Sequence, residues 1–199
     1  MRLRGVIASA LVAALAGCQS VRSADPGAAD PQRVAFRGGS LRKPDADGWK
    51  LEIKGRYGLM LARVGTDADQ THVIRASMFR IRALDSDAAL VAFVKEGQLA
   101  DQQRVHYELK GYTVAADPGR GARCVRTRTT TFERAGEIVP GRHAQYTVDD
   151  VALICVHPQD PAKGIMVGYS VRYRRGEVDP EFEARAARVL DSVRFAAID

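Results

Sequence analysis

The chain has 199 residues, of which 46% are hydrophobic and 27% are charged; three are cysteines, and the formal net charge is +6. The ordinary apolar content excludes a disordered chain and a collagen-like repeat, and the few cysteines exclude a small disulfide-rich scaffold. The composition therefore fits one globular domain that is moderately basic.

The first 17 residues have the pattern of a secretory signal peptide. Arg2 and Arg4 precede a run of uncharged small or apolar residues from Gly5 to Gly17. As a helix, this run would be about 20 Å long, whereas the hydrocarbon core of a bilayer is about 30 Å thick. We therefore expect residues 1–17 to be a removable signal and not a lasting membrane span.

The next residues resemble the lipobox of bacterial lipoproteins. Leu15, Ala16 and Gly17 precede Cys18 in the order of that motif. The resemblance implies that Cys18 becomes the N-terminus and carries acyl chains that anchor the protein to a membrane. Gln19 stands where an aspartate would favour the inner membrane, so the resemblance points to the cell envelope, on the periplasmic face of the outer membrane. The alternative is an ordinary signal peptide with a coincidental cysteine.

Residues 18–47 are expected to be the lipidated cysteine and a flexible tether. The segment is rich in Gly, Pro, Ser and Asp and has few large apolar residues, so it buries too little surface to order itself. Val34 and Phe36 are the exception and could form a short docked strand. A single globular domain would then cover residues 48–199, a length at which roughly 70% of the unfolded surface can be buried.

The globular region is predicted to be α+β, with an antiparallel sheet of about six to seven strands and about two helices packed on it. Asp85 or Ser86 is expected to cap the first helix, which would end at Gly97. Apolar residues at helical spacing indicate a second helix from Asp179 to Val193. β-compatible runs between turn residues predict strands at 49–53, 57–64, 72–81, 105–115, 124–134, 145–157 and 165–174.

The end of the chain resembles the PsbP-like α+β family. The resemblance rests on the segment Val167–Tyr173, the predicted helix Asp179–Val193 and the tail Ser192–Phe195. In that family the last long strand is followed by a helix that packs back on an antiparallel sheet, and the same sandwich is expected here. The family includes photosystem subunits, protein-binding adaptors and uncharacterised proteins, so the resemblance implies a fold and not a function.

Cys124 and Cys155 are predicted to form a disulfide. Their strands would form a hairpin around Val139 and Pro140, in which opposed residues have numbers that add up to about 279. The Cα atoms of opposed residues lie within the range that a disulfide accepts, and an exported compartment would keep the bond oxidised. The alternative is a zinc or copper site that also uses His157. No fourth ligand is evident, so we expect no metal and no cofactor.

Four arginines are candidates for an anion-binding stripe on one sheet surface. Arg126 and Arg128 would point to one side of their strand, and Arg172 and Arg174 to one side of theirs. Such a stripe would suit anionic lipid, lipopolysaccharide phosphates or an acidic protein. The alternative is a solvated face, because the chain has 24 arginines and only 6 lysines and arginine is therefore common throughout. The four residues are Arg126, Arg128, Arg172 and Arg174.

Evidence for catalysis is absent from the sequence. It contains no nucleophile elbow, P-loop, dinucleotide-binding or zinc-protease motif, and Asp149 and Asp150 would point to opposite faces of a strand and could not act as a pair. Nucleic acid is not expected as a partner, because no recognition motif is found. We therefore expect a lipid-anchored envelope lipoprotein without catalytic residues, acting as a binding module or adaptor for an envelope protein or an anionic envelope component. The alternative is a periplasmic enzyme or small-ligand-binding protein with an unrecognised site.

Overall fold

The computed structural model describes residues 30–44, 47–56, 58–67, 69–101, 107–139 and 142–198. The predicted signal peptide, Cys18 and the first part of the predicted tether lie outside the described residues. In chain order, the elements are β1 (Arg33–Phe36), β2 (Gly39–Arg42), β3 (Lys50–Lys54), β4 (Gly58–Val64), β5 (Thr71–Arg80), α1 (Asp87–Asp101), β6 (Tyr107–Ala116), β7 (Cys124–Val139), β8 (Arg142–His157), β9 (Asp160–Arg174), α2 (Phe182–Asp191) and β10 (Arg194–Phe195).

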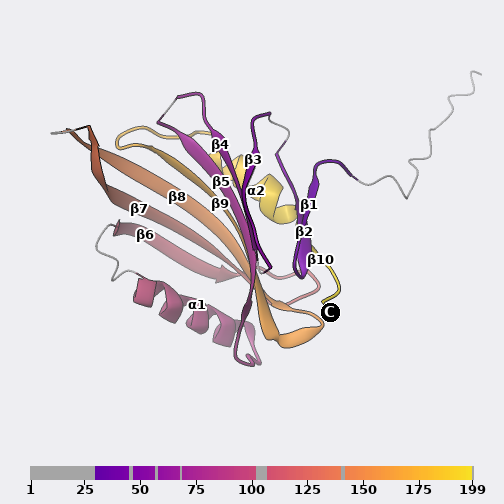
Figure 1. Ribbon diagram of the computed structural model, residues 1–199. Helices are drawn as coiled ribbons and strands as arrows, with labels where there is room; N and C mark the ends of the chain where they lie inside the picture. The colour runs from indigo at the N-terminus through magenta and orange to yellow at the C-terminus, as the bar shows by residue number, and fades with distance from the viewer. Residues whose placement is uncertain are drawn as a thin grey trace, which may run out of the picture.

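A large antiparallel sheet is the centre of the fold (Figure 1). Its strand order is β3-β4-β5-β9-β8-β7-β6, and β1, β2 and β10 form a second, smaller sheet. Helix α1 packs on β6 and β7, whereas α2 packs on β9 and β8 from the opposite face, together with the small sheet (Figure 1). The α+β prediction is confirmed, and each of the seven predicted strands corresponds to one strand of the large sheet. Neither helix of the described part is long and apolar enough to cross a membrane.

The two faces of the large sheet carry separate hydrophobic clusters. Side chains alternate between the faces along each strand, so one strand contributes to both clusters. The larger cluster lies beneath α2 and contains the apolar face of that helix. The smaller cluster lies beneath α1, where Leu90 and Val94 pack with Val125 and Val156. The α2 residues in the larger cluster are Phe182, Ala186, Val189 and Leu190.

The first helix begins as predicted but is longer than predicted. The Oγ atom of Ser86 accepts a hydrogen bond from the backbone N–H of Ala89 at 3.1 Å, so Ser86 is the N-terminal cap. The helix continues through Gly97 to Asp101, which makes the predicted end at Gly97 wrong. Gly97 does not have the positive φ of a helix-terminating glycine, and inside a helix it costs only about 1 kcal/mol relative to alanine.

The predicted tether is wrong for residues 33–42, which form the hairpin of β1 and β2. This hairpin belongs to the folded domain, because Leu41 is completely buried in the larger cluster and β2 pairs with β10 near the C-terminus. Local composition did not reveal the hairpin because its apolar contacts come from segments far away in the sequence. The docked strand that was expected at Val34 and Phe36 is β1.

His157 joins the small sheet to the large one. Its Nε2 atom lies 3.2 Å from the carbonyl oxygen of Gly38 and 3.1 Å from that of Ala196, and its Nδ1 atom accepts a bond from the N–H of Gln159 at 3.3 Å. One neutral tautomer, with the hydrogen on Nε2, satisfies all of these contacts. His157 therefore has a structural role, and the alternative metal site loses both of its cysteines to the disulfide described next.

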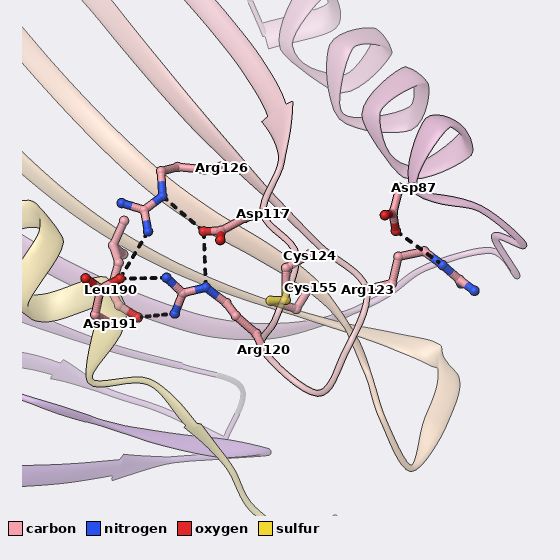
Figure 2. The surroundings of a disulfide bond; sticks show 9 residues. All are labelled: Asp87, Asp117, Arg120, Arg123, Cys124, Arg126, Cys155, Leu190 and Asp191. Atoms are coloured by element: carbon pink, nitrogen blue, oxygen red, sulfur yellow. Dashed lines mark hydrogen bonds and ion pairs between the residues drawn. A yellow bond between two sulfur atoms is a disulfide. The ribbon is translucent and has the colours of Figure 1, made fainter.

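The predicted disulfide between Cys124 and Cys155 is present, and the two residues lie opposite each other in the β7–β8 ladder. The segment before Cys124 connects both helices to this point (Figure 2). Arg120 pairs with Asp191 at 2.6 Å, at the end of α2, and Arg123 pairs with Asp87 at 3.7 Å, in the first turn of α1. The disulfide therefore lies where both helices are attached to the sheet.

Removing the disulfide should lower the free energy of unfolding by about 2–4 kcal/mol, because the bond closes a loop with a sequence separation of 31 residues. The change is Cys124→Ala together with Cys155→Ala, and urea unfolding of the variant and of the oxidised wild type measures the difference. As a control, reductant should destabilise the wild type and leave the variant unchanged. Equal stability of the two oxidised proteins would contradict the expectation.

Candidate functional site

The four predicted stripe arginines do not share a surface. In the β7–β8 ladder Arg126 lies opposite Leu153, which belongs to the cluster beneath α2. Arg172 lies opposite Val148 of the same strand, and residues 148 and 153 point to opposite faces. Arg126 and Arg128 are therefore on the α2 face, whereas Arg172 and Arg174 are on the α1 face. The prediction of a single stripe is wrong. With this register, the even-numbered residues of β7 around Arg126 lie on the α2 face, whereas the even-numbered residues of β9 around Arg172 lie on the α1 face.

Each of these arginines also has a carboxylate partner inside the domain. Arg126 contacts Asp117 at 3.0 Å and Asp191 at 3.1 Å (Figure 2). An arginine held in this way is already partly neutralised and is a weaker anion site than an unpaired cation. The other ion pairs are Arg128 with Glu183 at 2.5 Å, Arg172 with Glu133 at 2.5 Å, and Arg174 with Asp69.

A basic pocket of about 630 Å³ lies at the end of β5, and we call it the sheet-end pocket. Four segments that are distant in sequence build it: the β1–β2 turn, the β3–β4 turn, the end of β5 and the start of β9. Arg80 and Lys163 lie opposite each other in the β5–β9 ladder. The pocket is lined by Arg37, Arg56, Met78, Phe79, Arg80 and Lys163.

Two glycines allow the chain to form this pocket. Gly38 has a φ of +81° in the β1–β2 turn, and a Cβ atom there would lie 3.3 Å from the Sδ atom of Met78. A Cβ atom at Gly164 would lie 2.5 Å from the Phe79 ring, which therefore needs a glycine beneath it. Met78 and Phe79 both line the pocket, and because they are adjacent in β5 their side chains belong to opposite faces of the sheet.

The charged residues that the structure describes in the lining of the sheet-end pocket are all cationic. Four cationic side chains line it, and no described lining residue is acidic. Within the described residues, Arg80 and Lys163 have no carboxylate at ion-pair distance. Such an arrangement favours a ligand that carries phosphate or carboxylate groups next to an apolar portion. None of the residues that line this pocket was predicted to be a binding residue.

A second basic pocket, of about 460 Å³, lies at the other end of the β1–β2 hairpin, and we call it the hairpin-base pocket. The guanidinium of Arg33 is fixed there by bonds from Nη1 to Ser40 Oγ at 3.0 Å and to the Ser192 carbonyl at 3.1 Å. Burial lowers the pKa of Arg33, and the positive charges of Arg194 and Arg42 lower it further. The charged lining residues are Arg33, Arg42, Lys43, Arg188, Asp191 and Arg194.

Two adjacent carboxylates, Asp149 and Asp150, do not form a catalytic pair. Asp149 accepts a hydrogen bond from the Tyr173 hydroxyl on the α2 face. Asp150 pairs with Arg75 at 2.8 Å on the other face. Burial raises the pKa of Asp150, while the charge of Arg75 lowers it. The prediction that the two carboxylates point to opposite faces is confirmed, and the part of the chain that the structure describes contains no cluster of three metal-ligating side chains.

His72 and Tyr169 form a buried polar pair in the larger cluster. The Nδ1 atom of His72 lies 2.9 Å from the Tyr169 hydroxyl, and the two residues are 1% and 0% exposed. Burial lowers the pKa of His72 to about 4, and the charges of Arg63 and Arg185 lower it further. His72 is therefore neutral in the folded protein at neutral pH, and the pair is closed to any substrate.

The comparisons with known proteins identify the fold. No family model matches the sequence, and no curated protein matches it. Among solved structures, the solution structure of cyanobacterial PsbP (CyanoP) from Synechocystis sp. PCC 6803 is similar, with a TM-score of 0.52 over 88% of this chain and 99% of that chain. The sequence identity is 11%, so the similarity shows a PsbP-like fold and carries no function.

The buried His72 should make the protein less stable in mild acid. Its pKa is about 4 in the folded state and about 6.5 when unfolded, so the unfolded state binds the proton more tightly. Above pH 6.5, His72 is neutral in both states and does not lower the free energy of unfolding. As the pH falls from 6.5 to 4, this residue lowers the free energy of unfolding by up to about 1.4 kcal/mol per pH unit. Urea unfolding at pH 7 and pH 4.5 should show a smaller acid loss for His72→Gln than for the wild type. Parallel losses would contradict this assignment.

Proposed function

We propose that this protein is a lipid-anchored bacterial envelope lipoprotein whose folded domain binds an anionic envelope component in the sheet-end pocket and does not catalyse a reaction. The residues up to Cys18 support the anchor, because charge, length and motif agree. The composition of the sheet-end pocket supports the choice of an anionic ligand. The lipid would hold the domain at the periplasmic face of the outer membrane.

The observation that carries the ligand proposal is the presence of four cationic residues in the lining of one pocket, next to the apolar residues Met78 and Phe79. Arginine binds phosphate and carboxylate through paired N–H groups, and lysine adds a point charge. Met78 and Phe79 would contact an apolar part of the same ligand. Phosphorylated amphiphiles of the envelope, such as lipopolysaccharide, combine these two properties.

The anchor is tested with Cys18→Ser. Without the thiol that receives the lipid, the protein should appear in the released fraction or remain as the unprocessed precursor. Membrane fractionation and intact-mass measurement of both proteins distinguish these outcomes. A control with Cys124→Ala and Cys155→Ala should stay in the membrane fraction. Unchanged fractionation and mass of the Cys18→Ser protein would contradict lipidation.

The ligand site is tested by charge reversal with Arg80→Glu and Lys163→Glu. The probes are purified lipopolysaccharide and, separately, inorganic pyrophosphate, and binding is measured by calorimetry. We expect the affinity for lipopolysaccharide to fall by at least about tenfold, because two attractive charges become repulsive. The matched control, Lys50→Glu with Lys95→Glu, makes the same change of charge at two exposed lysines outside both basic pockets and should bind like the wild type. No binding by the wild type, or equal binding by both variants, would reject the site.

A further inference from the structure

We propose that the hairpin-base pocket is a docking surface for anionic lipid headgroups of the membrane that holds the anchor. The inference rests on the proposed lipid anchor and adds an orientation of the domain to it. Its occupant is the phosphate of a phospholipid headgroup in the same membrane.

The described lining of the hairpin-base pocket is mostly cationic. Five cationic side chains and one carboxylate, that of Asp191, line the pocket. Asp191 is already bound by Arg120 and Arg126, which lie outside the lining. Among the described residues, Lys43, Arg188 and Arg194 have no carboxylate at ion-pair distance. Juxtaposed cations of this kind attract anionic headgroups, at about 1 kcal/mol for each residue near the membrane surface.

The segments that form this surface are hydrogen-bonded to one another. Arg33 is held by two hydrogen bonds to Ser40 and Ser192, and the N–H of Arg42 donates to Ser192 Oγ at 2.8 Å. Ser192 follows α2, so β1, β2 and the end of that helix are fixed against one another. The backbone around the pocket and the guanidinium of Arg33 therefore need little ordering when a headgroup binds.

The described part of the chain begins beside the hairpin-base pocket. Asp30 contacts Arg42 at 2.6 Å and thus lies at the edge of the pocket. Asp30 is twelve positions after Cys18, a distance of at most roughly 40 Å even for a fully extended chain. The chain from the anchor therefore enters the domain beside this pocket, which favours orientations in which the surface around Asp30 faces the membrane.

The geometry of the hairpin leaves the sheet-end pocket open in this orientation. Arg33 pairs with Arg42 at the base of the hairpin, and Phe36 pairs with Gly39 at its turn. Arg37, in the turn, lines the sheet-end pocket. The two basic pockets are thus at opposite ends of the same hairpin, and docking of one on the membrane would direct the other away from it.

The experiment uses the full lipidated protein in nanodiscs of phosphatidylcholine, with or without phosphatidylglycerol. Phenylglyoxal modifies accessible arginines, and mass spectrometry measures the rate at each one. With phosphatidylglycerol, modification of Arg33, Arg42, Arg188 and Arg194 should slow by at least about threefold. Arg80 should react at the same rate in both discs. High salt should remove the protection, because exposed charges are screened.

Arg188→Glu with Arg194→Glu should abolish the protection of Arg33 and Arg42, whereas Arg188→Lys with Arg194→Lys should retain it. The matched control, Arg80→Glu with Lys163→Glu, should leave it intact. Thermal unfolding of each variant verifies that it is folded. Equal rates in the two discs, or equal protection of all arginines, would overturn the proposal.

The same modification experiment on the Cys18→Ser chain with phosphatidylglycerol vesicles separates the docking surface from the anchor. If lipidation is wrong, the arginines of the hairpin-base pocket should still be protected in a charge-dependent way. If docking is wrong, the protein should still require Cys18 for membrane fractionation and show no headgroup-dependent protection. Protection that follows an added envelope protein instead of phosphatidylglycerol would also reject the lipid as occupant.

Discussion

The register of the β7–β8 hairpin is the constraint on which the rest of the structure depends. A shift of one residue would move every side chain of one strand to the opposite face, and both hydrophobic clusters would lose their members. The disulfide between Cys124 and Cys155 links one opposed pair and excludes such a shift. The segment that precedes it is attached to α2 through Arg120 and to α1 through Arg123 (Figure 2). One covalent link therefore fixes the pairing that gives each helix an apolar surface to cover.

With the register fixed, the remaining elements follow from what must be buried. Each helix covers one face of the sheet, and the small sheet extends the cover on the α2 side, where Leu41 enters the core (Figure 1). His157 provides the polar link between the two sheets without exposing an unpaired group, because its ring nitrogens bond backbone atoms of both. The ends of the β1–β2 hairpin are left at the surface, and the two basic pockets form there.

The sequence was sufficient for features that local patterns determine. Strand positions follow from alternation and turn residues, the helix cap was predicted at Asp85 or Ser86 and lies at Ser86, and the disulfide follows from hairpin symmetry. The sequence was not sufficient for features that depend on contacts between residues far apart in the chain. The burial of Leu41 depends on β10 and on the core of the large sheet, and the faces of Arg126 and Arg172 depend on offsets between strands. The sheet-end pocket combines four separate segments. Its weak local signal is a cation beside a glycine, as in Arg37-Gly38, Gly55-Arg56 and Lys163-Gly164.

The ion pairs determine where positive charge remains uncompensated on the domain, which the moderate net charge of the chain does not reveal by itself. Near the middle of the sheet, Arg75 and Arg128 pair with carboxylates, so their charges are cancelled locally. Lys163 and Arg188, which have no such partners among the described residues, lie at the pockets at the two ends of the hairpin. Because paired charges contribute little to the field at a distance, each of these two ends should have a positive potential. The hairpin thus has a basic pocket at each end, which permits a membrane contact at one end and a ligand at the other.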